Sequence, residues 1–225
     1  AYRTVRANLS FSDIDNELKT ILFTSTKQNE GKSTTTCNIA HSFSQLENKK
    51  VLLLDLDLRN PTVHKLFAKS NTYGVIDFLK GNVGLDKCIH KEGENLYILP
   101  TGTIPPNPTE VLSSKKMSDF VKSVKEEYDY ILIDAPPVGI VSDASIIASF
   151  VDGVMFVIES DVTDISHAEI AIENLNKVGA NILGAILNKF DSSKTNYGYY
   201  GYYYEEQESG SRKNKRGKRG KKKKF

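Results

Sequence analysis

The chain has 225 residues, 39% of them hydrophobic, so it can bury one substantial core, and we expect a single domain with irregular ends. The formal net charge of +2 hides an asymmetry: residues 212–225 carry ten Lys or Arg and no acid, which leaves 20 basic against 28 acidic residues, or −8, in residues 1–211. No apolar run approaches the ~18 residues that cross a bilayer, and Cys37 and Cys88 lack metal-ligand spacing, so the sequence excludes a membrane-spanning helix and favours a soluble chain with reduced, buried cysteines.

The first predicted element is a short amphipathic helix over residues 2–11. Val5 and Leu9 lie four positions apart and Arg3 and Arg6 three apart, so one side of the helix can present both guanidinium groups. Two arginines at this spacing suit a carboxylate on a partner surface. The alternative is an ordinary solvated helix face.

A phosphate-binding loop is the strongest signal in the chain. A predicted strand, residues 20–24, leads into a loop and then into a helix that begins near Lys32. The segment fits the pattern G-x-x-x-x-G-K-[ST] at Gly31, Lys32 and Ser33, with Thr26 in place of the first glycine. In this pattern the glycine lets the main chain approach phosphates, the lysine reaches the β- and γ-phosphates, and the serine hydroxyl is a ligand for Mg²⁺.

Two further predicted strands end in acidic residues. One covers residues 51–55 and is followed by Asp57, and the other covers residues 130–134. Both are apolar up to their last residue, which is typical of parallel strands that are buried on both faces. Ligands bind at the carboxyl edge of such sheets, so we expect Asp55, Asp57 and Asp134 beside the phosphate loop, where an aspartate can hold Mg²⁺ directly or through water.

The other predicted elements continue an alternation of helices with strands, which is typical of α/β proteins. We therefore predict an α/β, P-loop three-layer sandwich with a mostly parallel central sheet and helices on both faces. The remaining elements are helices within 63–85, including one over 75–79, a strand over 96–99, a turn-rich loop over 101–108, helices over 109–127, 144–150 and 165–178, and strands over 153–158 and 182–187.

The residues after the last strand match a nucleotide-base motif. Asn188, Lys189, Phe190 and Asp191 fit N-K-x-D, with which many GTPases read guanine. A GTPase usually also has D-x-x-G after its Mg²⁺ strand, whereas Asp134 is followed here by Ala-Pro-Pro. We therefore interpret Asn188 as a contact to the edge of a base and do not favour guanine.

The C-terminal part combines a tyrosine cluster with a basic tail. Six of the eleven tyrosines fall within residues 197–204, and acidic residues follow at 205, 206 and 208. Acidic flanks favour a kinase substrate over a nucleic-acid stacking platform, which interleaves aromatic with basic residues. The basic residues of 212–225 indicate a solvated tail, with anionic lipid or nucleic acid as the functional alternatives.

These motifs resemble those of the P-loop type of bacterial tyrosine kinase, which regulates capsular and extracellular polysaccharide synthesis in Firmicutes. Residues 25–34, 51–59 and 131–137 resemble the family's Walker A, second acidic and Walker B motifs, and 102–108 resembles its proline-rich loop. Residues 197–204 resemble its tyrosine cluster. The resemblance covers nearly the whole chain, and the paired aspartates together with the tyrosines are its specific part.

The resemblance implies an ATP- and Mg²⁺-dependent tyrosine autokinase with Lys32, Asp55, Asp57 and Asp134 as catalytic residues, Asp55 being the base for the tyrosine hydroxyl. It implies Ser33, Asp57 and Asp134 as metal ligands, and Arg3 and Arg6 resemble the arginines of the family's E-x-x-R-x-x-R subunit contact. Together with the motifs above, the predicted nucleotide contacts are Lys27, Asn29, Glu30, Gly31, Lys32, Ser33, Thr34 and Asn188. Lys27 lies where related ATPases carry a second, intermolecular lysine. The implied phosphoacceptors are Tyr197, Tyr199, Tyr200, Tyr202, Tyr203 and Tyr204.

The resemblance also implies partners and a cellular location. It implies a cytoplasmic chain that phosphorylates tyrosines in trans within a ring-like homo-oligomer and is recruited to the inner face of the membrane by a separate transmembrane activator. A tyrosine phosphatase and polysaccharide-synthesis enzymes are implied regulators or substrates, and no specific nucleic acid is expected. We expect a contact helix in residues 1–15, a kinase domain in 16–191 and a flexible tail in 192–225. The alternatives are a switch ATPase of the MinD/ParA type, or a scaffold that uses the tyrosines as an adhesive.

Overall fold

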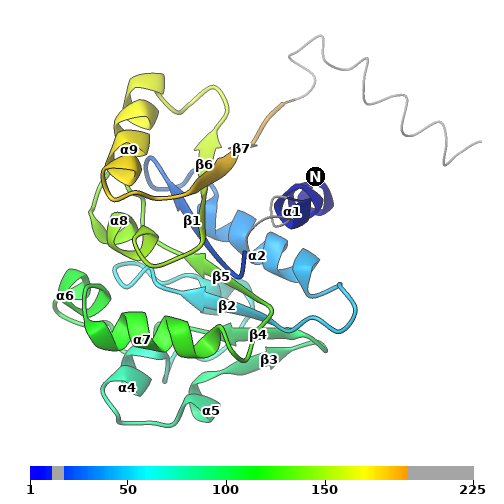
Figure 1. Ribbon diagram of the computed structural model, residues 1–225, viewed down its shortest axis with the longest axis vertical. Coiled ribbons are helices and arrows are strands. Elements are labelled where there is room, and N and C mark those ends of the chain that lie inside the picture. Colours follow the sequence, from blue (N-terminus) through cyan, green and yellow to red (C-terminus); the bar gives the residue numbers. More distant parts are fainter. Residues whose placement is uncertain (12–17, 192–225) are drawn as a thin grey trace, which may run out of the picture. The chain divides into compact units, whose positions relative to one another are not determined.

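A seven-stranded sheet organises the chain. The computed structural model describes residues 1–11 and 18–191, and its sheet has the strand order β3-β4-β2-β5-β1-β6-β7 (Figure 1). Neighbouring strands are parallel except for the antiparallel pair β3 and β4. The strands are β1 (Thr20–Ser25), β2 (Val51–Asp55), β3 (His90–Glu92), β4 (Leu96–Leu99), β5 (Tyr130–Asp134), β6 (Gly153–Glu159) and β7 (Ile182–Asn188).

Helices connect the strands and cover both faces of the sheet (Figure 1). None of those in the described ranges is long and apolar enough to span a membrane. The helices are α1 (Tyr2–Phe11), α2 (Lys32–Phe43), α3 (Val63–Leu66), α4 (Val75–Leu79), α5 (Leu85–Cys88), α6 (Pro108–Leu112), α7 (Lys115–Val124), α8 (Asp143–Ala148) and α9 (Ile165–Lys177).

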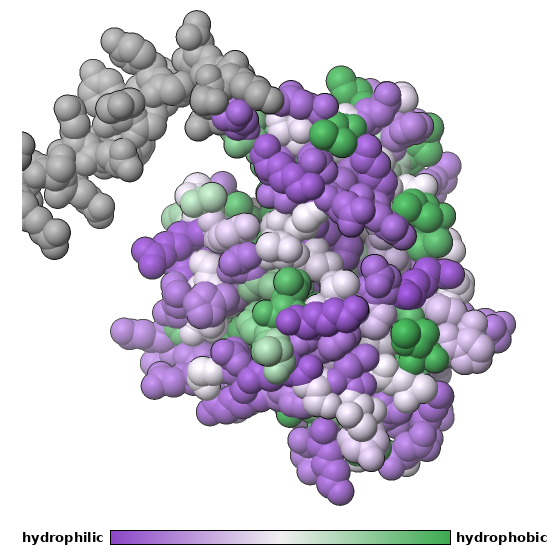
Figure 2. Space-filling model, turned by 180° about the vertical axis from the view of Figure 1, so that it is seen from behind, coloured by the Kyte–Doolittle hydropathy of each residue, from purple (hydrophilic) through white to green (hydrophobic). Residues whose placement is uncertain are grey.

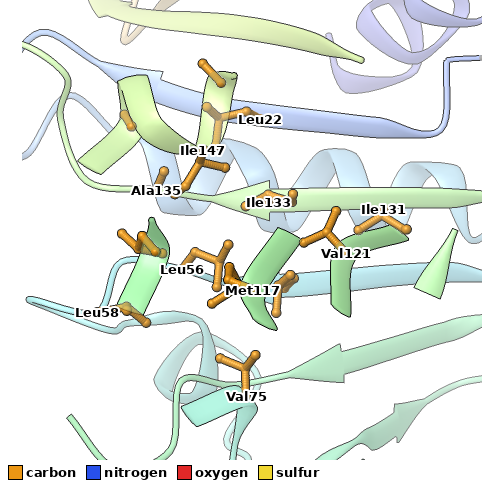
Figure 3. Close-up of a cluster of buried hydrophobic side chains, with 14 of the residues drawn as sticks. Leu22, Leu56, Leu58, Val75, Met117, Val121, Ile131, Ile133, Ala135 and Ile147 are labelled. Carbon is orange, nitrogen blue, oxygen red and sulfur yellow. The ribbon is translucent and has the colours of Figure 1, made fainter. Parts of the chain in front are cut away.

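Alternate residues of each central strand enter different cores, because successive side chains of a strand point to opposite faces. In β5, Ile131 and Ile133 belong to the cluster that also holds residues of α7, α8 and α9, which Figure 3 shows in part. Leu132, between them, belongs to the second cluster, which holds residues of α1 and α2. The predicted three-layer α/β sandwich is therefore confirmed, with each central strand buried on both faces.

Two details differ from the sequence prediction. The single helix predicted over 109–127 is wrong: α6 and α7 are separate, because Ser114 is extended and its side chain accepts a hydrogen bond from the N–H of Met117 as an N-cap. The sequence also did not predict β3, which has three polar residues and pairs only with β4 at the sheet edge. The other predicted strands are found within one residue of their expected bounds.

The outer surface of the molecule is largely polar. On the face shown in Figure 2, apolar residues form small separate patches within a hydrophilic surface. Single exposed apolar side chains are normal on a folded protein. The charged residues that distinguish one region of the molecule are instead buried, at and just beyond the carboxyl ends of β1, β2 and β5.

Candidate active site

The phosphate loop connects β1 to α2. Gly31, immediately before α2, has a φ of 84°, in the left-handed region that glycine enters without strain. A Cβ atom at Gly31 would lie 2.0 Å from Nδ2 of Asn188. Both the turn and the approach of Asn188 therefore require glycine here, and the turn leaves the positive end of the α2 dipole facing the loop.

Lys32 lies at the centre of a cluster of charges. Its Nζ is 2.7 Å from Oδ1 of Asp134 and 3.7 Å from Oδ2 of Asp57, and it donates to the Ser33 hydroxyl at 3.0 Å. Lys32 is 7% exposed and Asp134 is fully buried, so little water screens their attraction. The first turn of one helix and two strand ends thus bring together a lysine, a serine and two of the three predicted aspartates.

One oxygen of Asp134 has no protein partner in the described part of the chain. Oδ1 accepts hydrogen bonds from Lys32 at 2.7 Å and Thr36 at 3.4 Å, whereas the buried Oδ2 accepts none. A buried, unpaired carboxylate oxygen is costly unless a ligand or ion meets it. With the Ser33 hydroxyl and Asp57 nearby, the donor set fits Mg²⁺, which takes one or two carboxylates and completes its shell with water and substrate phosphates.

A metal site made from protein ligands alone is not found in residues 1–11 and 18–191. No group of three or more His, Cys, Asp or Glu side chains there is arranged to hold an ion.

The paired aspartates have different surroundings. Asp55 is fully buried, and its carboxylate accepts the backbone N–H groups of Thr62 at 3.1 Å, Val63 at 3.0 Å and Asp57 at 3.1 Å. Burial raises the pKa of Asp55 to about 8, and burial also raises the pKa of Asp57. Through its hydrogen bonds with Thr62 and Val63, Asp55 fixes the start of α3, whereas Asp57 faces the adjoining cavity.

This cavity has a volume of about 260 Å³ and lies beside the phosphate loop. The predicted site residues that line it are Lys27, Asn29, Gly31, Lys32, Ser33, Thr34 and Asp57. Asp55, Asp134, Glu30 and Asn188 do not line it. The other lining residues were not predicted as site residues. Ser25, Gln28 and Pro137 lie inside the predicted motifs, whereas Asn60, Thr62 and Leu66 follow the second acidic motif.

Two predicted nucleotide contacts bind the loop itself. Nδ2 of Asn188 donates to the carbonyl of Glu30 at 2.9 Å, and the Glu30 carboxylate accepts the N–H groups of Thr26 and Lys27. A base contact by Asn188 stays a prediction. Lys27 lines the cavity, while its Nζ donates to the carbonyl of Val162 at 3.1 Å.

The predicted oligomer contact lies on α1. Arg3 is exposed, whereas Arg6 donates from its guanidinium to the carbonyl of Ser42 in α2, within the same chain. The subunit contact stays a prediction. The six tyrosines predicted as phosphoacceptors lie outside the described residues.

Comparisons with known proteins agree with this geometry. A family model described as an AAA domain matches residues 18–188. Tyrosine-protein kinase YwqD of Bacillus subtilis is 42% identical over 200 residues, which cover 88% of this chain and 84% of that protein. The kinase domain of Escherichia coli tyrosine kinase ETK has a TM-score of 0.80 at 31% identity, covering 88% of this chain and 79% of that one. The septum site-determining protein MinD of Pyrococcus horikoshii, complexed with Mg-ADP, has a TM-score of 0.64 at 27% identity, covering 77% and 71%.

Proposed function

This chain belongs to the bacterial tyrosine-protein kinases of the P-loop type, and from that premise we propose that it transfers the γ-phosphoryl group of ATP to C-terminal tyrosines of a neighbouring subunit. The observation that carries the proposal is the contact of Lys32 with Asp134 and Asp57 beside a cavity. Phosphoryl transfer needs positioning and charge neutralisation more than covalent chemistry. The backbone N–H groups of the phosphate loop supply the positioning, and Lys32 supplies part of the charge neutralisation.

The donor set supports a requirement for Mg²⁺ in this proposal. Ser33 and Asp134 would hold Mg²⁺, and the unpaired Oδ2 of Asp134 supports this assignment. When bound, the ion neutralises charge that develops on the transferred phosphoryl group. We expect EDTA to abolish labelling from radioactive ATP and added Mg²⁺ to restore it; labelling that persists in EDTA would contradict the metal assignment.

During transfer the tyrosine oxygen bonds to the γ-phosphorus and ADP leaves, and a carboxylate must accept the proton of the tyrosine hydroxyl. The resemblance implies Asp55 in this role. Accessibility supports Asp57 instead, because Asp57 lines the cavity while the Asp55 carboxylate accepts three backbone N–H groups. Asp57→Asn should therefore remove more of the phosphoryl-transfer rate than Asp55→Asn at equal ATP occupancy, and the opposite order would return the role to Asp55.

The sequence of the tail supports its tyrosines as the phosphoacceptors. The tyrosines of 197–204 follow the last strand, with acidic residues directly after them. Each phosphotyrosine adds about −1.5 to −2 charge to a chain whose first 211 residues already sum to −8. We propose that phosphorylation disperses a ring-like homo-oligomer, which Arg3 and Arg6 help to assemble.

The proposed setting is polysaccharide synthesis and export at a membrane. We propose that a separate transmembrane activator recruits the chain from the cytoplasm, as the membership in this kinase family implies. A tyrosine phosphatase and polysaccharide-synthesis enzymes are the proposed regulators and substrates. Membrane fractionation of cells with and without the activator would test the recruitment, and an unchanged distribution would contradict it.

Mixing two variants tests transfer in trans. One chain carries Lys32→Met with its tyrosines intact, and the other has an intact loop but Phe at all six tyrosines of 197–204. After incubation with labelled ATP, mass spectrometry of peptides from 195–211 should find phosphotyrosine on the Lys32→Met chain. No label on the Lys32→Met chain at any concentration, while wild-type chains incubated separately are labelled, would show transfer within one chain. No label in the wild type even with the activator would refute the kinase assignment.

The second candidate is a switch ATPase without kinase activity, favoured by the structural likeness to MinD. The two functions share the loop and the aspartates and differ in the fate of the phosphoryl group. A switch ATPase releases inorganic phosphate and leaves the tyrosines unmodified, so parallel measurement of free phosphate and phosphotyrosine distinguishes them.

A further inference from the structure

An acidic residue lies inside the phosphate-binding loop. Glu30 is fully buried, and a carboxylate so near to bound phosphates is repulsive unless donors neutralise it. Its Oε2 accepts the backbone N–H groups of Thr26 at 2.8 Å and Lys27 at 3.0 Å, and its Oε1 accepts the hydroxyl of Thr163. These hydrogen bonds hold the carboxylate away from the cavity, which Glu30 does not line.

Thr163 is itself anchored to the end of β6. Its hydroxyl accepts the N–H of Glu159 at 2.9 Å, and its own N–H donates to the carbonyl of Glu159 at 3.1 Å. A second link runs in parallel, because Nζ of Lys27 donates to the carbonyl of Val162 at 3.1 Å. The segment between β6 and α9 therefore holds two side chains of the phosphate loop, those of Glu30 and Lys27.

The end of β7 holds the same loop from a third direction. Nδ2 of Asn188 donates to the carbonyl of Glu30 at 2.9 Å, and Nζ of Lys189 donates to the carbonyl of Asn29 at 2.8 Å. Lys189 also pairs with Glu159 at 2.9 Å. The carbonyls of Asn29 and Glu30 thus bind residues at the end of β7, which leaves the N–H groups at the start of α2 for anions.

We propose that Glu30 and Thr163 are positioning residues that hold the phosphate loop in its binding conformation by tying it to the segment between β6 and α9. Neither lines the cavity beside the phosphate loop. The inference rests on the proposed nucleotide site but not on the kinase chemistry. A loop fixed in this way loses less conformational freedom when a nucleotide binds, so the contact between Glu30 and Thr163 strengthens binding without touching the ligand.

The test uses the full chain and ADP with Mg²⁺ in titration calorimetry. Thr163→Val removes the hydroxyl at nearly constant volume, and we expect about tenfold weaker ADP binding, the usual loss for a hydrogen bond to a charged group. Thr163→Ser keeps the hydroxyl and should bind ADP within about twofold of the wild type. Glu30→Gln should also weaken ADP binding. In a chain that already carries Glu30→Gln, Thr163→Val should weaken ADP binding less than it does in the wild type, because both changes act on the same contact.

A matched control separates positioning from general stability. Thr103 donates its hydroxyl to Asp77 at 2.6 Å, a bond of the same chemical type in another loop. Thr103→Val should lower the midpoint of thermal unfolding without changing ADP affinity. Wild-type affinity in both Thr163→Val and Glu30→Gln would overturn the inference, as would a loss in Thr163→Val that Thr163→Ser does not restore. A wild-type chain that binds no ADP would instead refute the proposed nucleotide site.

Discussion

The two ends of the central sheet use aspartate in opposite ways. At the amino ends, Asp152 accepts the N–H and the hydroxyl of Thr20, each at 2.8 Å, and pairs with Lys125 at 2.7 Å. Burial by itself would raise the pKa of Asp152, but hydrogen bonds from Lys125 and Thr20 outweigh burial and hold this pKa below its usual range. At the carboxyl ends, burial raises the pKa of Asp55 and Asp57.

Asp129 repeats the amino-end arrangement beside β5. Asp129 accepts the N–H of Lys50 at 2.8 Å and pairs with Lys49 at 2.9 Å. Burial by itself would raise the pKa of Asp129, but these contacts outweigh burial and lower it. Asp134, at the other end of the same strand, keeps an oxygen without a partner among the described residues. Carboxylates at the amino ends therefore stabilise the fold, whereas those at the carboxyl ends stay in a costly environment that a ligand can relieve.

The largest expected effect is at Lys32. Lys32→Met should lower autophosphorylation by at least ~10²–10³-fold, because it removes the cation that faces the phosphates. It should also destabilise the fold, because Asp134 is then buried without its cation. Adding Asp134→Asn should recover the midpoint of thermal unfolding but not the activity. Labelling that survives Lys32→Met would mean that this loop is not the active site.

A second substitution should separate activity from stability. Asp57→Asn is expected to lower phosphoryl transfer by ~10²-fold. Because burial disfavours the charged form of Asp57, the same change should leave the free energy of unfolding unchanged or raise it in buffer without nucleotide or metal. Urea unfolding alongside an ATP-labelling assay measures both. A marked loss of stability would show that the two ends of the sheet do not differ as we infer.

The converse change lies at the amino end. Asp152→Ala removes the acceptor for Thr20 and the partner of Lys125, and we expect it to lower the free energy of unfolding by about 2–3 kcal/mol. ADP affinity and the phosphorylation rate at a permissive temperature should match the wild type, because Asp152 lies at the opposite end of β1 from the phosphate loop. Asp152→Asn, which keeps one acceptor oxygen, should lose less stability than the alanine variant.

The smallest expected effect is a change in pH dependence. The pKa of Asp152 is lower in the folded chain than its value of about 3.9 in an unfolded one, so its stabilisation is present above that pH and is lost as the pH falls through the folded value. Asp152→Asn should therefore flatten the acid side of a plot of unfolding free energy against pH. An acid limb identical to that of the wild type would exclude Asp152 as a source of acid sensitivity.

Local patterns determined most of the fold and the centre of the site. The apolar runs at 51–54 and 131–133 are long enough to identify buried parallel strands, and the Gly31–Ser33 motif requires a strand before it and a helix after it. Because parallel strands end at one edge of a sheet, the aspartates that follow them could be expected near Lys32. The structure brings Asp57 and Asp134 there.

Only the tertiary structure decided how each carboxylate is used. Asp55 and Asp57 have the same sequence signal, but the start of α3 turns one into a buried helix anchor and leaves the other facing the cavity. Likewise, Glu30 meets Thr163 across 133 positions of the chain. A periodic pattern reports which face of an element is buried, whereas the partner of a polar group depends on which distant segments pack beside it, and local sequence carries no record of that.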